Sequence, residues 1–120
     1  MRILVTGDRC WQCFDLAERI VNRLIARYGY GLTIVHGAAT GVDESFAKAC
    51  AELGIKTEPH IAEWRHWGTA AWPMRNARMV AAGAAMCIAL HRTLETGKGT
   101  KDCVRKAIAA GIPTFLITDD

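Results

Sequence analysis

Two short glycine-rich turns hold the residues of this chain that are best suited to binding chemistry. The turn Gly97–Thr100 (Gly-Lys-Gly-Thr) lies between an apolar run and a helical pattern, and the turn Gly37–Gly41 (Gly-Ala-Ala-Thr-Gly) follows another apolar run. Glycine lets a ligand approach the backbone closely, and the first N–H groups of a helix have no partner within it. A strand, a glycine-rich turn and a helix N-terminus in that order form a cradle for anions. The two turns predict a ligand that carries phosphate, without identifying it.

Positively charged side chains near these turns could neutralise a phosphate. Arg9 follows the first apolar run of the chain, and Arg75 and Arg78 lie near the start of the third helical pattern. The planar guanidinium group of arginine can hold a phosphate through two parallel hydrogen bonds. The binding residues expected from the turns and from these charges are Arg9, Gly37, Ala38, Gly41, Arg75, Arg78, Gly97, Lys98, Gly99 and Thr100.

The turn Gly37–Gly41 also has a purely structural interpretation. Thr40 and Asp43 have the threonine-to-acid spacing of a capping box, in which Asp43 would only close the N-terminus of the next helix. Turn glycines are common in α/β proteins, so each turn alone carries little weight. The occurrence of both turns at one edge of the expected sheet favours anion binding.

Two familiar nucleotide-binding motifs are absent from the sequence. No G-x-G-x-x-G follows the first apolar run, which argues against a dinucleotide site of the usual kind. The turn Gly97–Thr100 lacks the spacing of a Walker loop, which argues against an ATPase.

The cysteines and histidines favour packing over chemistry. Cys10 and Cys13 form a C-x-x-C pair at a helix start, but their place in the chain does not fit the topology of a thioredoxin, which disfavours a redox role. The four histidines show no metal-ligand spacing, so we expect no metal site, and nothing in the chain calls for a cofactor. The other cysteines occupy apolar positions, where a free thiol acts as a small hydrophobe.

Three tryptophans, Trp64, Trp67 and Trp72, lie in the segment 62–72, which we expect to be a long loop. They fit two roles, which are packing of the loop as a lid onto the domain and stacking of one indole ring on a nucleotide base. Packing is the favoured interpretation, because rings of this size bury well without a ligand.

The elements that must position these residues alternate regularly along the chain. Short apolar runs predict strands, and apolar residues at three- and four-residue spacing predict helices. The expected strands are Ile3–Thr6, Leu32–His36, Lys56–Ile61, Met86–His91 and Pro113–Thr118, and the expected helices are 13–28, 42–53, 73–83 and 100–110. Strict alternation predicts a Rossmann-like three-layer α/β/α fold, whose five-stranded parallel sheet has the order 3-2-1-4-5. A ligand is then expected at the carboxyl edge of the sheet between strands 1 and 4, where the winding reverses.

The strands differ in their expected burial. Pro59 lacks a backbone N–H and places the third strand at an edge of the sheet. The other four strands are almost uniformly apolar, which predicts burial on both faces.

Length, composition and charge limit the class of protein. A chain of 120 residues that is 51% apolar predicts a single domain over residues 1–120. The sequence contains no run of about 18 apolar residues, so it predicts no membrane span. The apolar N-terminus is too short for a signal peptide, and we therefore expect a cytoplasmic protein. The net charge of +3 accommodates a nucleotide-like small molecule but argues against nucleic acid as a partner.

Four segments in a fixed order carry a family resemblance. They are Val5–Trp11, His36–Asp43, Trp64–Met79 and Gly97–Asp102, and together they span essentially the whole chain. They resemble the small YspA-like proteins of the SLOG superfamily, which are related to bacterial YpsA. The superfamily also contains the LOG phosphoribohydrolases and the DNA-processing protein of natural transformation. The resemblance implies a Rossmann-like fold, a nucleotide or nucleotide-derived ligand, and the site residues Gly7, Arg9, Gly37, Gly41, Asp43, Arg75, Asn76, Arg78, Gly97, Gly99 and Thr100.

The chain departs from the LOG enzymes at one motif. LOG enzymes carry P-G-G-x-G-T-x-x-E, whose glutamate takes part in cleaving an N-glycosidic bond. Glu95 and Thr96 stand in place of the proline and the first glycine, and Cys103 stands in place of the glutamate. A thiol does not stabilise an oxocarbenium-like centre as a carboxylate does, which argues against hydrolysis of the LOG type.

These observations support one main hypothesis and two alternatives. The main hypothesis is a module that binds a nucleotide or phosphoribosyl ligand, as a sensor or a processing unit. The first alternative is a nucleoside-monophosphate phosphoribohydrolase, with Asp43 or Asp102 in place of the glutamate and Arg75 or Arg78 on the 5′-phosphate. The second is single-stranded nucleic-acid binding, by analogy with the DNA-processing relative. The LOG relatives also imply a homodimer, although the sequence leaves the oligomeric state open.

Overall fold

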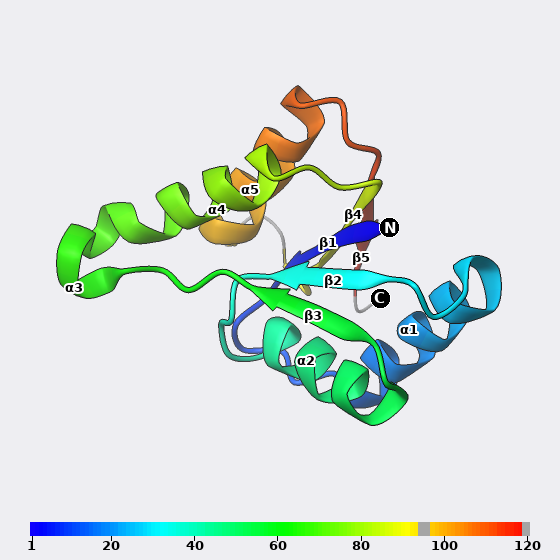
Figure 1. The fold of residues 1–120 in the computed structure, drawn as a ribbon. Coiled ribbons are helices and arrows are strands. Elements are labelled where there is room, and N and C mark those ends of the chain that lie inside the picture. Colours follow the sequence, from blue (N-terminus) through cyan, green and yellow to red (C-terminus); the bar gives the residue numbers. More distant parts are fainter. Residues whose placement is uncertain (94–96, 119–120) are drawn as a thin grey trace.

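A computed structural model of the chain describes residues 1–93 and 97–118 and contains alternating strands and helices (Figure 1). The strands are β1 (Arg2–Gly7), β2 (Thr33–His36), β3 (Lys56–Pro59), β4 (Met86–Leu90) and β5 (Thr114–Ile117). The helices are α1 (Phe14–Tyr28), α2 (Val42–Leu53), α3 (Trp64–Trp67), the 3₁₀ turn η1 (Gly68–Ala70), α4 (Ala71–Ala81) and α5 (Lys98–Ala109). The expected order of elements is therefore observed.

The strands form one parallel sheet in the order β3-β2-β1-β4-β5, which confirms the prediction. The register places Leu4 of β1 beside Val35 of β2 on one side and beside Cys87 of β4 on the other. Helices α1 and α2 cover one face of the sheet, and α4 and α5 cover the other (Figure 1). This arrangement gives the three layers of a Rossmann-like fold.

Each face of the sheet has its own core. On the α1–α2 face, Ile3 and Val5 of β1 pack in one cluster with Phe46 of α2, and none of the three is exposed. On the α4–α5 face, Leu4 packs in a second cluster with Met79 of α4 and with other buried residues of both helices. Alternate residues of β1 thus point to opposite helical layers, as the two-residue period of a strand requires.

The segment 62–72 is not the long loop that the sequence predicts. It contains α3 and η1, and α4 already begins at Ala71, two residues before Pro73. Proline is tolerated there because the first N–H groups of a helix have no intrahelical acceptor. Figure 1 shows α3 at the end of α4 that lies farthest from the sheet. The tryptophans therefore lie on a helical extension.

Strand β5 is less buried than its apolar sequence predicts. Phe115 is 55% exposed and Leu116 is 48% exposed. The reason is position, because β5 lies at the edge of the sheet and pairs only with β4. Among the described residues, no helix is long and apolar enough to cross a membrane.

A candidate ligand cavity at the carboxyl edge of the sheet

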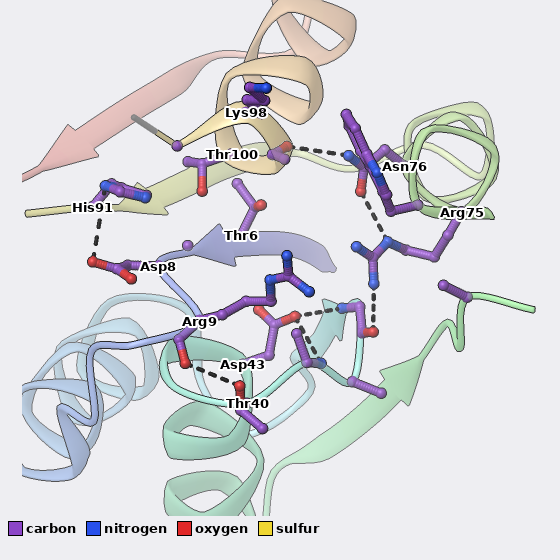
Figure 2. A pocket seen from close by; sticks show the side chains of 18 of the residues that line it. Thr6, Asp8, Arg9, Thr40, Asp43, Arg75, Asn76, His91, Lys98 and Thr100 are labelled. Carbon is purple, nitrogen blue, oxygen red and sulfur yellow. Dashed lines mark hydrogen bonds and ion pairs between the residues drawn. The ribbon is translucent and has the colours of Figure 1, made fainter. Parts of the chain in front are cut away.

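A cavity of about 1000 Å³ lies at the carboxyl edge of the sheet, where the sequence predicts the ligand. The loops after β1, β2 and β4 and the first turns of α4 and α5 line it (Figure 2). The chain leaves β1 toward one face of the sheet and leaves β4 toward the other, which opens a crevice between them. All the predicted site residues line this cavity except Gly41 and Arg78.

Gly7 and Gly41 allow the loops below the cavity to pack closely. A Cβ atom at Gly7 would lie 2.4 Å from the carbonyl oxygen of Leu90 and 2.6 Å from Cγ1 of Val42. Gly41 has a φ of +74°, and a Cβ atom there would lie 2.4 Å from the carbonyl oxygen of Asp8. Both positions require glycine for the contact between the β1 loop and α2, so Gly41 is a packing residue.

The turn Gly37–Gly41 has little N–H capacity left for an anion. The backbone N–H groups of Gly37 and Ala39 donate to Oδ2 of Asp43, at 3.1 and 3.2 Å. The N–H of Ala38 donates to Nδ1 of His36 at 3.0 Å. The chain's own side chains thus occupy three donors of this turn. These three N–H groups are therefore not available to a phosphate, and a cradle at this turn stays a prediction with little support from its hydrogen bonds.

The predicted capping box is also absent. The Thr40 hydroxyl donates to the carbonyl oxygen of Arg9 at 2.9 Å, and Gly41 stands at the N-cap of α2, with no side-chain cap. Asp43 folds back onto the preceding turn instead of capping the N-terminus at Thr40 (Figure 2).

Asp43 is the most unusual charged group of the cavity. Its side chain is almost completely buried, and burial raises the pKa of its carboxyl group to about 6, although the two backbone N–H groups and the charge of Arg75 oppose this. Oδ2 accepts both hydrogen bonds from the turn, whereas Oδ1 has no partner among the described residues. A buried carboxylate oxygen without a partner is rare in folded proteins.

The turn Gly97–Thr100 remains open to the cavity. Helix α5 begins at Lys98, two residues earlier than predicted, and Gly97 at its N-cap has no side chain with which to close the helix end. The N–H groups of Lys98, Gly99 and Thr100 make no hydrogen bond to a described residue, and the first helical bond runs from Lys101 to Gly97. The three residues line the cavity, and a helix N-terminus whose first N–H groups have no described acceptor is an arrangement that binds anions.

The two glycines of this turn have different roles. A Cβ atom at Gly97 would lie 2.4 Å from Nε2 of His91, so this position must be glycine for His91 to fit. A Cβ atom at Gly99 would meet no atom of the described residues within 4 Å, and its φ does not require glycine. Packing against the described residues therefore does not require glycine at this lining position.

Arg75 and Asn76 link the two turns. Nη1 of Arg75 donates to the carbonyl oxygen of Gly37, and a Cβ atom at Gly37 would collide with this guanidinium group at 2.2 Å. Nε of Arg75 donates to Oδ1 of Asn76 at 2.9 Å. The amide nitrogen of Asn76 donates to the carbonyl oxygen of Gly99 and to Asp102, each at 3.1 Å. Asn76 is 1% exposed and acts as a brace between α4 and α5.

Arg78 and Asp102 lie outside the cavity. Arg78 is exposed and donates to the carbonyl oxygen of Ile61 at 2.9 Å. Asp102 accepts from Asn76 and contacts Nζ of Lys106 at 2.6 Å. The structure thus gives Arg78 and Asp102 structural partners, and it leaves Asp43 as the candidate carboxylate of the cavity. Glu95 and Thr96, which differ from the LOG motif, lie outside the described residues.

The cavity contains charged residues that motif spacing does not reveal. Asp8 contacts Nε of Arg92 at 3.2 Å and accepts from the N–H of Cys10 at 2.8 Å. Burial alone would raise the pKa of Asp8, but these hydrogen bonds outweigh it and the pKa lies below its usual range. Nδ1 of the buried His91 accepts from the N–H of Thr93, so the neutral ring carries its proton on Nε2. Asp8 directly follows the apolar strand β1, and His91 directly follows the apolar strand β4. This position was the sequence signal that could have identified both residues.

Two tryptophans reach the cavity. Trp64 and Trp72 contribute to its lining, whereas Trp67 does not. Trp64 is 47% exposed at the rim, and Trp67 is 49% exposed on the same helical turn. The rings of Trp67 and His66 meet in a T-shaped arrangement, with 5.8 Å between their centroids. The expected lid is therefore limited to Trp64 and Trp72.

The cysteines form no disulfide, and no group of described side chains could hold a metal ion. Cys10 is exposed and lines the cavity, while Cys13 is buried. Burial raises the pKa of the Cys13 thiol, which makes it a poor nucleophile. Cys103 is fully buried and does not line the cavity.

Comparisons with known proteins agree with this architecture. A family model described as "YspA, cpYpsA-related SLOG family" matches residues 1–67. The chain is 36% identical over 123 residues to the Gene 61 protein of Mycobacterium phage D29, an alignment that covers 98% of this chain and 97% of the phage protein.

Two solved structures share the fold. DNA processing protein A (DprA) from Streptococcus pneumoniae matches with a TM-score of 0.73 and 20% identity over 99% of this chain, which spans 50% of the DprA chain. The structural-genomics protein TM1055 matches with a TM-score of 0.71 and 15% identity over 94% of this chain and 71% of its own. The family match over more than half of the chain, on the fold and cavity described above, shows that this protein belongs to the YspA, cpYpsA-related SLOG family.

Proposed function

We propose that the protein binds a nucleotide or a phosphoribosyl compound in this cavity, with the phosphate at the N-terminus of α5. The observation that carries the proposal is the first turn of α5, whose three residues line the cavity and whose three backbone N–H groups have no acceptor among the described residues. Lys98 and Arg9 line the same cavity and add positive charge. Free helix-terminal donors, the helix dipole and nearby cations favour a phosphate at this place.

The remaining walls suit the rest of such a ligand. A volume of about 1000 Å³ is at the upper end of the usual range for small-molecule sites and accommodates a nucleotide. Trp64 and Trp72 offer indole surfaces at the rim, where a base could stack.

A homodimer, in which a second copy of the chain is the partner, stays a prediction that rests on the LOG relatives.

Phosphoribohydrolase activity is a second candidate function, and Asp43 is the residue that favours it. Hydrolysis of an N-glycosidic bond requires a carboxylate near the developing oxocarbenium centre. Asp43 has a free oxygen and a pKa near 6, whereas Asp102 is held by Lys106 outside the cavity. DprA is named as a DNA processing protein. The net charge of +3 gives little support to nucleic-acid binding by this chain.

The decisive experiment fills the open space at Gly99. A Gly99→Ala variant adds a methyl group that meets no atom of the residues that the structure describes, so we expect the melting temperature without ligand to stay the same or rise slightly. The methyl group occupies the space next to the free N–H groups, and we expect AMP binding to weaken at least about ten-fold, as for a lost charged hydrogen bond. Calorimetry or ligand-dependent thermal shift measures both effects.

A matched control separates the site from a general effect of the substitution. Gly31 lies in the exposed turn before β2, at the opposite edge of the sheet, and a Cβ atom there also meets nothing within 4 Å. Gly31→Ala should leave AMP binding unchanged. Equal binding by wild type, Gly99→Ala and Gly31→Ala would refute the proposed phosphate position. Mass spectrometry of the same samples decides between binding and hydrolysis, because only the hydrolase releases free adenine.

A further inference from the structure

Asp43 carries an oxygen that the protein itself does not use. Oδ1 is the one buried side-chain nitrogen or oxygen without a hydrogen-bond partner among the described residues. The Asp43 side chain is 5% exposed and lines the ligand cavity. Figure 2 shows both of its hydrogen bonds leaving from the other oxygen, toward the turn Gly37–Gly41.

The structural role of Asp43 uses only one of its two carboxylate oxygens, Oδ2. Holding the turn requires one acceptor, Oδ2, and an asparagine could supply that acceptor without a charge. Burial of a carboxylate is unfavourable unless its oxygens are paired. The neighbouring Arg75 donates to the carbonyl oxygen of Gly37 and to Oδ1 of Asn76. Oδ1 of Asp43 is enclosed and lacks a described donor, and it belongs to a residue that lines the ligand cavity. A hydroxyl group of a bound ligand could supply the missing donor once the side chain adjusts to it.

The chemistry of this donor is restricted by the charge of Asp43. A phosphate would be repelled by the carboxylate, so the anionic end of the ligand must lie elsewhere, at the free N–H groups of α5. The donors that a phosphoribosyl compound carries closest to its phosphate are the ribose hydroxyl groups. Trp64, which suits a base, lies at the half-exposed rim, whereas Asp43 is buried.

We propose that Asp43 Oδ1 accepts a hydrogen bond from a ribose hydroxyl group and thereby selects ribose phosphates over their deoxyribose counterparts. This inference rests on the proposed function and names the sugar that the site requires. The protein would then respond to ribonucleotides or their fragments and discriminate against deoxynucleotides. The selection follows from the general rule that a site built to hydrogen-bond a hydroxyl strongly rejects the analogue that lacks it.

The test compares ribose 5-phosphate with 2-deoxyribose 5-phosphate on the wild-type protein by calorimetry. We expect the ribose compound to bind at least about ten-fold more tightly, since a hydrogen bond to a charged group has this effect. Equal affinities would overturn the inference and leave the proposed function standing. Absence of binding by both sugar phosphates, and by AMP, would refute the proposed function as well.

Variants then assign the preference to Asp43. Asp43→Asn should reduce the ratio of the two affinities to below about three-fold, because the amide presents a donor where Oδ1 presented an acceptor. Inorganic phosphate should bind the variant at least as well as the wild type, because the anion contacts α5. A purely structural Asp43 would instead change both sugar affinities equally, which would overturn the assignment.

Two further arms keep the result interpretable. Glu44→Gln removes the neighbouring, exposed carboxylate in the first turn of α2 and should preserve the ribose preference. AMP, 2′-deoxy-AMP, 3′-deoxy-AMP and inosine monophosphate separate the two hydroxyl groups from the amino group of the base. Loss of affinity with inosine monophosphate alone would show that Asp43 reads the base, against the inference. The comparison of ligands on the wild type holds even if Asp43→Asn fails to fold.

Discussion

The two glycine-rich turns look alike in sequence and differ in what they leave free. Both follow a buried strand, and both precede a helix at the same edge of the sheet. The turn Gly37–Gly41 is closed, because Asp43 and His36 occupy three of its N–H groups. The turn Gly97–Thr100 is open, because the first three N–H groups of α5 find no described partner. Glycine thus serves tight packing in the first turn, and in the second, under the proposed function, Gly99 gives a ligand access to the helix end.

The largest difference between the turns should appear in stability. Gly41→Ala combines a φ of +74° with a Cβ atom 2.4 Å from a backbone oxygen, so we expect it to lower the free energy of unfolding by about 3 kcal/mol. Gly99→Ala meets neither obstacle and should change it by less than about 1 kcal/mol. Urea denaturation of both variants measures this contrast. A similar loss at both positions would mean that the turns are not structurally different.

The second effect concerns the dependence of stability on pH. The carboxyl of Asp43 has a pKa of about 6 in the folded protein against a usual value of 3.8, because of its burial. Between these values the folded state binds more protons than the unfolded state, so this group's contribution to stability decreases as the pH rises from about 4 to 6. At 1.36 kcal/mol per pKa unit, the loss is at most about 3 kcal/mol.

Asp43→Asn removes this titration and sharpens the comparison of the turns. We expect the variant to gain stability relative to the wild type as the pH rises, with a difference of about 1–2 kcal/mol between pH 4.5 and pH 7.5. Thermal denaturation of both proteins across this range gives the measurement. A constant difference between them at all pH values would show that Asp43 has an ordinary pKa and a partner for Oδ1.

The smallest expected effect is electrostatic and belongs to the open turn. Lys98 is exposed, and its ammonium group lies at the start of α5 beside the cavity. Lys98→Ala should weaken AMP binding by about three- to five-fold at low salt and less at high salt, because screening reduces the attraction. Lys56→Ala, on the distant edge strand β3, serves as the control for a lost surface charge. Equal losses in both variants would contradict a local role for Lys98.

The sequence predicted the fold well because the fold depends on periodicity. Apolar runs and helical spacing are local signals, and a parallel sheet of alternating elements allows few arrangements, so the strand order followed. The exposed Phe115 and Leu116 were not foreseen, although the predicted strand order already placed the fifth strand at an edge. Its apolar composition was taken as a sign of burial on both faces, which an edge strand does not need. Helix α3 was missed because four residues are too few to show a period.

The candidate site was harder to predict, because the role of each residue depends on its hydrogen-bond partners, which the sequence does not show. Arg78 and Arg75 look equivalent in sequence, yet Arg75 reaches Gly37 while Arg78 turns to Ile61 outside the cavity. Asp43 fitted a capping box by spacing and instead bonds the preceding turn, which only the three-dimensional arrangement reveals. Residue types indicated the edge of the sheet at which the cavity lies, and the contacts showed which of these residues line it.

The brace through Asn76 sets a fixed length inside the cavity. An unbroken path of hydrogen bonds runs from the carbonyl of Gly99 through Asn76, Arg75 and Gly37 to Asp43. The open helix end and the unused carboxylate oxygen are therefore held apart by side chains within the protein. If a ligand binds as proposed, the distance between its phosphate and its hydroxyl group must match the distance that this brace sets. A longer or shorter molecule of the same composition would not reach both ends.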